Sequence, residues 1–140
     1  MKNNIKPVHT RMIRGEGKYT PDEVLPYVVP ETSSKLQTKL FDGDEIKMNS
    51  LRLNVFKEKG CICVKCGVEG VYFVKEKEIN KPPTERYHFN LYAIKEGEEV
   101  LMIKERIVLK SLGGKEVMEN LVPMCKKCHD EDVSLRGTKK

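Results

Sequence analysis

The sequence predicts a small α+β domain, and two features of residues 47–140 support this. Three segments rich in β-branched and aromatic residues, at about 71–78, 88–94 and 100–109, lie between two segments with helical spacing. The helical segments, at about 49–59 and 125–135, each adjoin one of two Cys-x-x-Cys pairs. A chain of 140 residues is sized for one domain and buries roughly two-thirds of its unfolded surface, so a cross-link would add useful stability.

The N-terminal segment differs in character, and we expect residues 1–46 to form an extension or arm of the domain at 47–140. Three prolines between residues 21 and 30 exclude a long helix or a central strand there. The run 32–41 is compatible with a short, Ser- or Thr-capped helix. The cations of residues 1–18 are compatible with an arm on a phosphate backbone or with an ordinary solvated terminus.

Composition indicates a soluble, highly charged protein. Charged residues make up 34% of the chain, hydrophobic residues 39%, and the formal net charge is +5. No apolar run approaches the ~18 residues that span a bilayer, and the basic N-terminus lacks the apolar stretch of a signal peptide. We therefore expect a cytoplasmic protein with no membrane partner. The mild positive charge permits nucleic-acid binding without arguing strongly for it.

Disulfides are disfavoured in the cytoplasm, so we expect the five cysteines to be metal ligands, with one left over that binds no metal. A Cys-x-x-Cys turn directs two thiolates at one ion, and two such turns complete a tetrahedral Cys₄ zinc site. The predicted ligands of this structural zinc are Cys63, Cys66, Cys125 and Cys128. Cys61 could compete with Cys63, although the spacing favours Cys63. A redox pair and ordinary buried cysteines are the alternatives.

The second Cys-x-x-Cys pair ends a longer motif, ERIVLKSLGGKEVMENLVPMCKKCH, which begins at Glu105 and ends at His129. This pattern resembles the HNH (ββα-metal) endonuclease family. In that family a strand carries an Asp-His pair, which is followed by a Ser-x-Gly-Gly loop, an Asn, a Cys-x-x-Cys pair and a final His or Asn. The resemblance implies a zinc-bound ββα fold, with an antiparallel hairpin from about residue 100 to 124 and a helix across it.

The resemblance also implies roles for individual residues. Asn120 matches the Asn that ties the two strands of the loop together, and His129 matches the last metal ligand. Glu105 stands where the family has a metal-binding Asp, so Glu105 and His129 are candidate ligands of Mg²⁺ or another divalent ion. Arg106 stands where the family has the histidine that activates water. The loop residues in place are Ser111, Gly113 and Gly114, while Leu109 replaces a proline.

These departures predict a degenerate catalytic site. A general base must release a proton near pH 7, and the guanidinium of Arg106 does not. Loss of such a base typically costs ~10²–10⁴-fold in rate. The extra methylene of Glu105 also displaces its carboxylate. Arginine is nevertheless well suited to grip a phosphate, so binding without cleavage is expected. The alternative is that Arg106 pairs with Glu105 or another acid.

Three functions follow for the chain. The first is an HNH-family protein that binds nucleic acid, with double-stranded DNA the expected partner, and cleaves it poorly or not at all. The second is an active metal-dependent HNH endonuclease with a non-standard base, for which His88 is the candidate. The third is a phage or mobile-element interaction module that binds a protein partner on an HNH scaffold. Basic residues around the motif suit the first, although acidic residues interrupt them; these are Lys104, Lys110, Lys115, Lys126 and Lys127.

Overall fold

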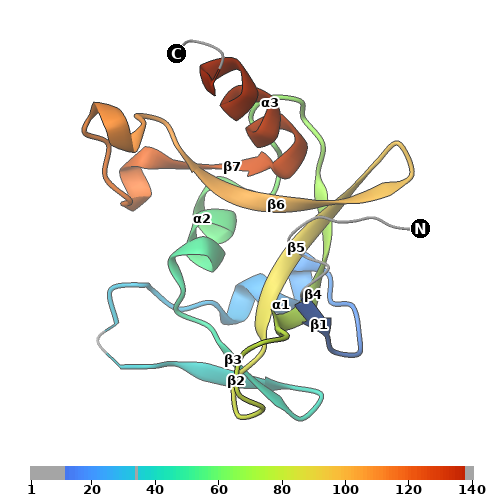
Figure 1. Cartoon of the computed structure of the whole chain (residues 1–140). Helices are drawn as coiled ribbons and strands as arrows, with labels where there is room; N and C mark the ends of the chain where they lie inside the picture. Colours follow the sequence, from blue (N-terminus) through green and yellow to red (C-terminus); the bar gives the residue numbers. More distant parts are fainter. Residues whose placement is uncertain (1–11, 34, 138–140) are drawn as a thin grey trace.

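The computed structural model describes residues 12–33 and 35–137, and these form a mixed α+β structure around one five-stranded antiparallel sheet (Figure 1). The strand order is β1-β4-β5-β6-β7. The strand bounds are β1 (Met12–Arg14), β4 (Gly70–Glu78), β5 (His88–Lys95), β6 (Glu98–Arg106) and β7 (Leu121–Cys125). The α+β class predicted from the sequence is therefore confirmed. Within the described residues no helix is long and apolar enough to cross a membrane.

Strand β6 joins two parts of the sheet. Its first half pairs with β5, from Glu98 opposite Lys95 to Leu101 opposite Tyr92. Its second half pairs instead with β7, from Met102 opposite Cys125 to Arg106 opposite Leu121. In Figure 1, β6 runs from its hairpin with β5 across to β7, beneath the C-terminal helix α3 (Lys126–Gly137). The second half of β6, together with β7 and α3, forms a strand–strand–helix unit.

Helix α2 (Leu51–Lys59) packs on the other side of β7 and supplies part of the core. It begins after Ser50, whose hydroxyl accepts a hydrogen bond from the backbone N–H of Leu53. It ends at Gly60, whose φ of 95° favours glycine. Four phenylalanine rings from different elements meet beside it at centroid distances of 4.8 to 6.2 Å, and these are Phe41, Phe56, Phe73 and Phe89.

The described part of the N-terminal segment packs on the rest of the chain. Strand β1 pairs with β4, and a short helix α1 (Pro21–Val24) runs into the 3₁₀ turn η2 (Leu25–Tyr27). Core side chains contributed from this segment include Val24, Val28, Phe41 and Ile46. The domain boundary after residue 46 stays a prediction, and residues 1–11 of the expected arm lie outside the described residues.

The short helix expected at residues 32–41 is wrong. Residues 38–41 form strand β2 (Thr38–Phe41), which pairs with β3 (Asp44–Lys47) as a separate two-stranded sheet. The reason is the two-residue turn at Asp42 and Gly43, where both φ angles are positive, at 51° and 87°. Asp-Gly is the dipeptide that favours a tight hairpin turn, and it overrides the weak helical preference of the preceding residues.

Candidate metal centre and adjacent cationic pocket

Four cysteine sulfurs meet where the first Cys-x-x-Cys turn reaches the start of α3. The Sγ atoms of Cys63, Cys66, Cys125 and Cys128 all lie within 4.8 Å of one another, and those of Cys66 and Cys125 are 3.8 Å apart. Such a group is close enough to hold a metal ion. The structure therefore brings together the four ligands that the sequence spacing predicts.

Local hydrogen bonds shape the first of the two turns. The N–H of Cys63 donates to the Val68 carbonyl at 2.9 Å, and the N–H of Gly67 donates to the Cys63 carbonyl at the same distance. The φ of Gly67 is 82°, a conformation that favours glycine. The Val64 N–H donates to the Pro123 carbonyl at 3.1 Å, which fastens this turn to β7 just before Cys125.

The four thiols differ in their readiness to ionise. Burial raises the pKa of Cys63, but backbone N–H groups directed at its sulfur outweigh this and lower that pKa to about 6. A backbone hydrogen bond from Val68 likewise lowers the pKa of Cys66. Burial raises the pKa of Cys125 and Cys128. Four thiolates this close repel one another, so a cation at their centre would be needed to hold all four ionised.

Lys95 is a neighbour of this cluster that sequence reasoning missed. It lies at the end of β5, and its interaction with the Cys66 sulfur raises the pKa of the Lys95 ammonium. A four-thiolate site with one divalent ion carries excess negative charge, and Lys95 lies where it offsets part of it. No sequence signal marks it, because the β5–β6 hairpin brings it there from a distant part of the chain.

Cys61 lies outside the four-sulfur group. It is buried, and burial raises the pKa of its thiol to about 11. Cys63 is therefore the cysteine of the first turn that joins Cys66 in the group, as the spacing favours. None of the five cysteines forms a disulfide bond.

Asn120 closes the loop between β6 and β7. Its Oδ1 accepts a hydrogen bond from the Val108 N–H at 2.8 Å, and its Nδ2 donates to the carbonyls of Val108 and Lys115 at 3.0 and 2.9 Å. Gly114 lies against the same strand end, where an added Cβ would stand 1.7 Å from the Val108 carbonyl oxygen. The loop can therefore close this tightly only with glycine at position 114.

The end of β6 meets the first turns of α3 through an acid and a histidine. Nδ1 of His129 lies 2.8 Å from Oε1 of Glu105, and both side chains are partly buried. Glu105 and His129 were predicted as ligands of a divalent ion, and the structure brings these two together. Among the described residues they form no group of three or more metal-ligating side chains.

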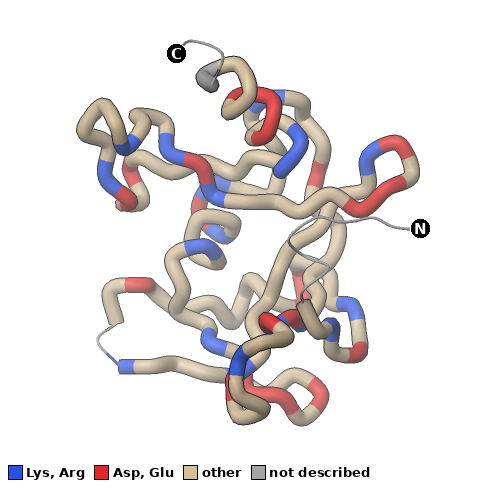
Figure 2. Tube along the Cα trace, in the orientation of Figure 1, with Lys and Arg blue, Asp and Glu red and all other residues tan. Residues whose placement is uncertain are grey.

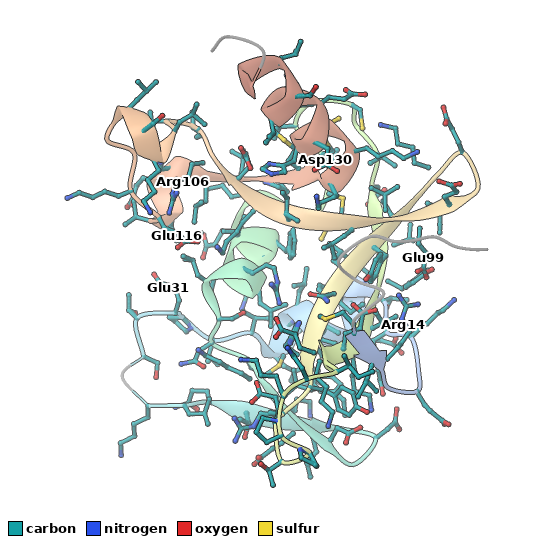
Figure 3. All side chains as sticks on the ribbon, in the orientation of Figure 1. Arg14, Glu31, Glu99, Arg106, Glu116 and Asp130 are labelled. Atoms are coloured by element: carbon teal, nitrogen blue, oxygen red, sulfur yellow. The ribbon has the colours of Figure 1, made fainter. Side chains whose placement is uncertain are left out.

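A pocket of about 400 Å³ opens beside this pair. Its charged lining consists of Lys104, Arg106, Lys110, His129, Glu105 and Glu116. Figure 3 shows Arg106 and Glu116 close together beside the β6–β7 loop, and Nη2 of Arg106 is 3.8 Å from Oε1 of Glu116. Lys104 forms a closer ion pair with the same carboxylate, which lowers the pKa of Glu116.

Arg106 is only partly satisfied by these contacts. Its Nε is buried without a hydrogen-bond partner, and the ion pair through Nη2 is long. In Figure 2, the end of β6 and the loop that follows it carry several blue segments, which mark Lys and Arg. The three fixed cations of the lining, Lys104, Arg106 and Lys110, outnumber its two carboxylates, so the pocket is suited to an anion.

Two other predicted residues lie apart from this pocket. Asn120 belongs to the loop but not to the pocket lining. His88, at the start of β5, is likewise not part of the lining. Burial lowers the pKa of His88, as does the nearby charge of Arg52, while Glu76, Glu78 and Glu85 oppose the shift. The charges that act on His88 therefore lie on α2, on β4 and in the loop between β4 and β5, and none of them belongs to the pocket lining.

Comparison with known proteins identifies no relative: no family model matches the sequence, no curated protein matches it, and no solved structure matches the fold.

Proposed function

We propose that the chain is an HNH-type protein that binds a phosphodiester of nucleic acid, expected to be DNA, and cleaves it poorly or not at all. The observation that carries this proposal is Arg106, whose partly exposed side chain lines a pocket with two further cations and makes only a long ion pair with Glu116 there. A phosphate in the pocket would offer a stronger contact, because a guanidinium can grip two phosphate oxygens at once. The strand–strand–helix unit and the Asn120 loop support this proposal, because the family is expected to have two strands, a loop tied by an Asn, and a helix.

The same residues argue against efficient cleavage. Arg106 occupies the position of the expected general base and does not release a proton near neutral pH. His88, the candidate for a non-standard base, has its charged neighbours elsewhere.

Glu105 and His129 fit a weakly held divalent cation. They offer one carboxylate and one imidazole, so phosphate oxygens and water would have to supply the other ligands. Such an ion would bind together with the phosphodiester and add to its affinity.

We infer that the ion of the four-cysteine group is a structural zinc. Zinc favours four tetrahedral thiolates, with Zn–S distances of about 2.3 Å that place sulfurs about 3.8 Å apart. The Cys66–Cys125 separation of 3.8 Å agrees with this geometry. A reducing cytoplasmic compartment would keep these thiols available for the metal.

Cleavage is tested by nicking of supercoiled plasmid with Mg²⁺, Mn²⁺ or Ni²⁺, beside an EDTA control. The natural chain is expected not to nick, whereas the double variant Glu105→Asp, Arg106→His is expected to restore metal-dependent nicking. Cutting by the natural chain would favour the active-nuclease alternative. Failure of both proteins to cut or to bind DNA would favour the protein-interaction alternative.

Binding is tested by fluorescence anisotropy with a labelled oligonucleotide across a salt series. Arg106→Ala is expected to weaken binding about tenfold at low salt and to reduce the salt slope by roughly 0.9 for each phosphate that is no longer neutralised. Arg86→Ala is the matched control, because Arg86 is also partly exposed and pairs with Glu45 near the β2–β3 hairpin. Equal effects of the two variants would refute a specific phosphate site.

A further inference from the structure

A second, apolar pocket adjoins the cationic one. It measures about 520 Å³ and lies between α3, the ends of β6 and β7, and the first cysteine turn. Its apolar lining consists of Val64, Ile107, Leu109, Val122, Met124 and Leu135. Glu105, Arg106 and Leu109 line both pockets, so the two cavities share a wall.

Three side chains of this lining are more exposed than apolar groups usually are. Val64, Ile107 and Leu135 are 55%, 59% and 65% exposed, and they come from three different elements. Apolar side chains gathered at one cavity and left in contact with water mark a binding surface more often than scattered ones do.

We propose that this apolar pocket takes the base of a nucleotide whose phosphate lies in the cationic pocket. The inference rests on the proposed function and adds the kind of nucleic acid bound: a strand with an unstacked base. The two pockets together suit an occupant with an apolar part and an anionic part on either side of one arginine. A nucleotide has these parts in that order, joined by a sugar.

The shared wall suits such an occupant. Arg106 can contact the phosphate from one side and the base from the other, since guanidinium planes stack on bases. A base inside a duplex is stacked on its neighbours and cannot enter without the cost of unstacking. Single strands and bulges are therefore preferred over continuous duplex.

The experiment uses the full chain and four labelled probes of equal length. These are a single-stranded oligonucleotide, the same backbone with abasic sites in place of every base, a blunt duplex, and a duplex with one bulged nucleotide. We expect the single strand to bind about tenfold more tightly than its abasic counterpart, because burying a base removes apolar surface from water. The bulged duplex should bind more tightly than the blunt one.

The double variant Val64→Ser, Leu135→Ser tests where the preference arises. Both side chains are more than half exposed, so the exchange should leave the fold intact, which a thermal unfolding curve checks. The variant should bind single-stranded and abasic probes alike, with abasic binding unchanged. Ile79→Ser is the matched control, since Ile79 is 61% exposed and lies outside both pockets.

The outcomes separate this inference from the proposed function. Equal, salt-dependent binding of the base-bearing and abasic strands would overturn the base pocket and leave phosphate binding standing. Tighter binding of the blunt duplex than of the single strand would overturn it in the same way. Absence of salt-dependent binding to any probe would refute both proposals. A preference that survives in the double variant would place the base elsewhere.

Discussion

The four-cysteine group and the cationic pocket share β7 and α3, yet they are built on opposite principles. The cysteine group gathers four like ligands within 4.8 Å, three of them buried, around a point where a cation is required. The pocket has three cationic side chains and two carboxylates in its lining, and only Glu105 and His129 there resemble a metal site. The same framework thus places a candidate metal site on one side and a pocket with an excess of cationic side chains on the other.

Because of this difference, we expect changes in the cysteine group to affect the stability of the fold and changes in the pocket to affect binding. Removing a ligand from the cysteine group should unfold the surrounding structure, because buried like charges lose their counterion. Changing a charge in the pocket should alter affinity while the fold persists, because its side chains remain partly exposed.

The largest expected effect comes from Cys125→Ser. Zinc sites of this kind can contribute ~10 kcal/mol to folding, so the variant should lose its metal and the cooperative unfolding transition of the natural protein. Metal content and thermal unfolding by circular dichroism measure this. Cys61→Ala is the control, because Cys61 is buried outside the group, and it should keep one zinc per chain and cost only about 1 kcal/mol. Similar losses in both variants would contradict the assignment.

A smaller effect is expected at the loop that frames the pocket. Gly114→Ala would place Cβ 1.7 Å from the Val108 carbonyl oxygen and so displace the strand end that Asn120 holds. Loss of those hydrogen bonds should lower the free energy of unfolding by about 3 kcal/mol, as measured in urea. A Cβ added at Gly113 has no neighbour within 4 Å, so only the positive φ of 90° disfavours Gly113→Ala. This variant should lower the free energy of unfolding by about 1–2 kcal/mol. The reverse order of the two variants would show that the loop does not close as described.

The smallest effect is a gain of affinity from Glu116→Gln. The hydrogen bond from Lys104 lowers the pKa of Glu116, so its carboxylate is ionised at neutral pH and offsets part of the pocket's positive charge. Removing that charge should tighten oligonucleotide binding about threefold at low salt, with little effect at high salt. Glu45→Gln makes the same change in net charge near the β2–β3 hairpin and should leave affinity unchanged. An equal gain in both variants would indicate a general charge effect.

Local signals predict most of the secondary structure correctly. Ser50 and Gly60 bound α2, and the three strand segments appear as β4, β5 and β6, because each signal acts within a few residues. The helix predicted at 32–41 is wrong because the Asp42-Gly43 turn, a stronger local signal, decides that region. The packing of residues 12–47 on the sheet has no local signal, since it depends on which distant surfaces the core leaves open.

The sequence alone predicted which four cysteines form one group, because a Cys-x-x-Cys turn directs its two sulfurs to the same side wherever it forms. It also determined that position 106 carries a permanent cation. Only the tertiary structure decided that Glu105 meets His129, that Glu116 is the acid beside Arg106, and that Cys66 raises the pKa of Lys95. These contacts exist because β6 pairs with β5 in its first half and with β7 in its second, and because α3 packs beside them. Both are interactions between residues far apart in the sequence, so no short motif predicts them.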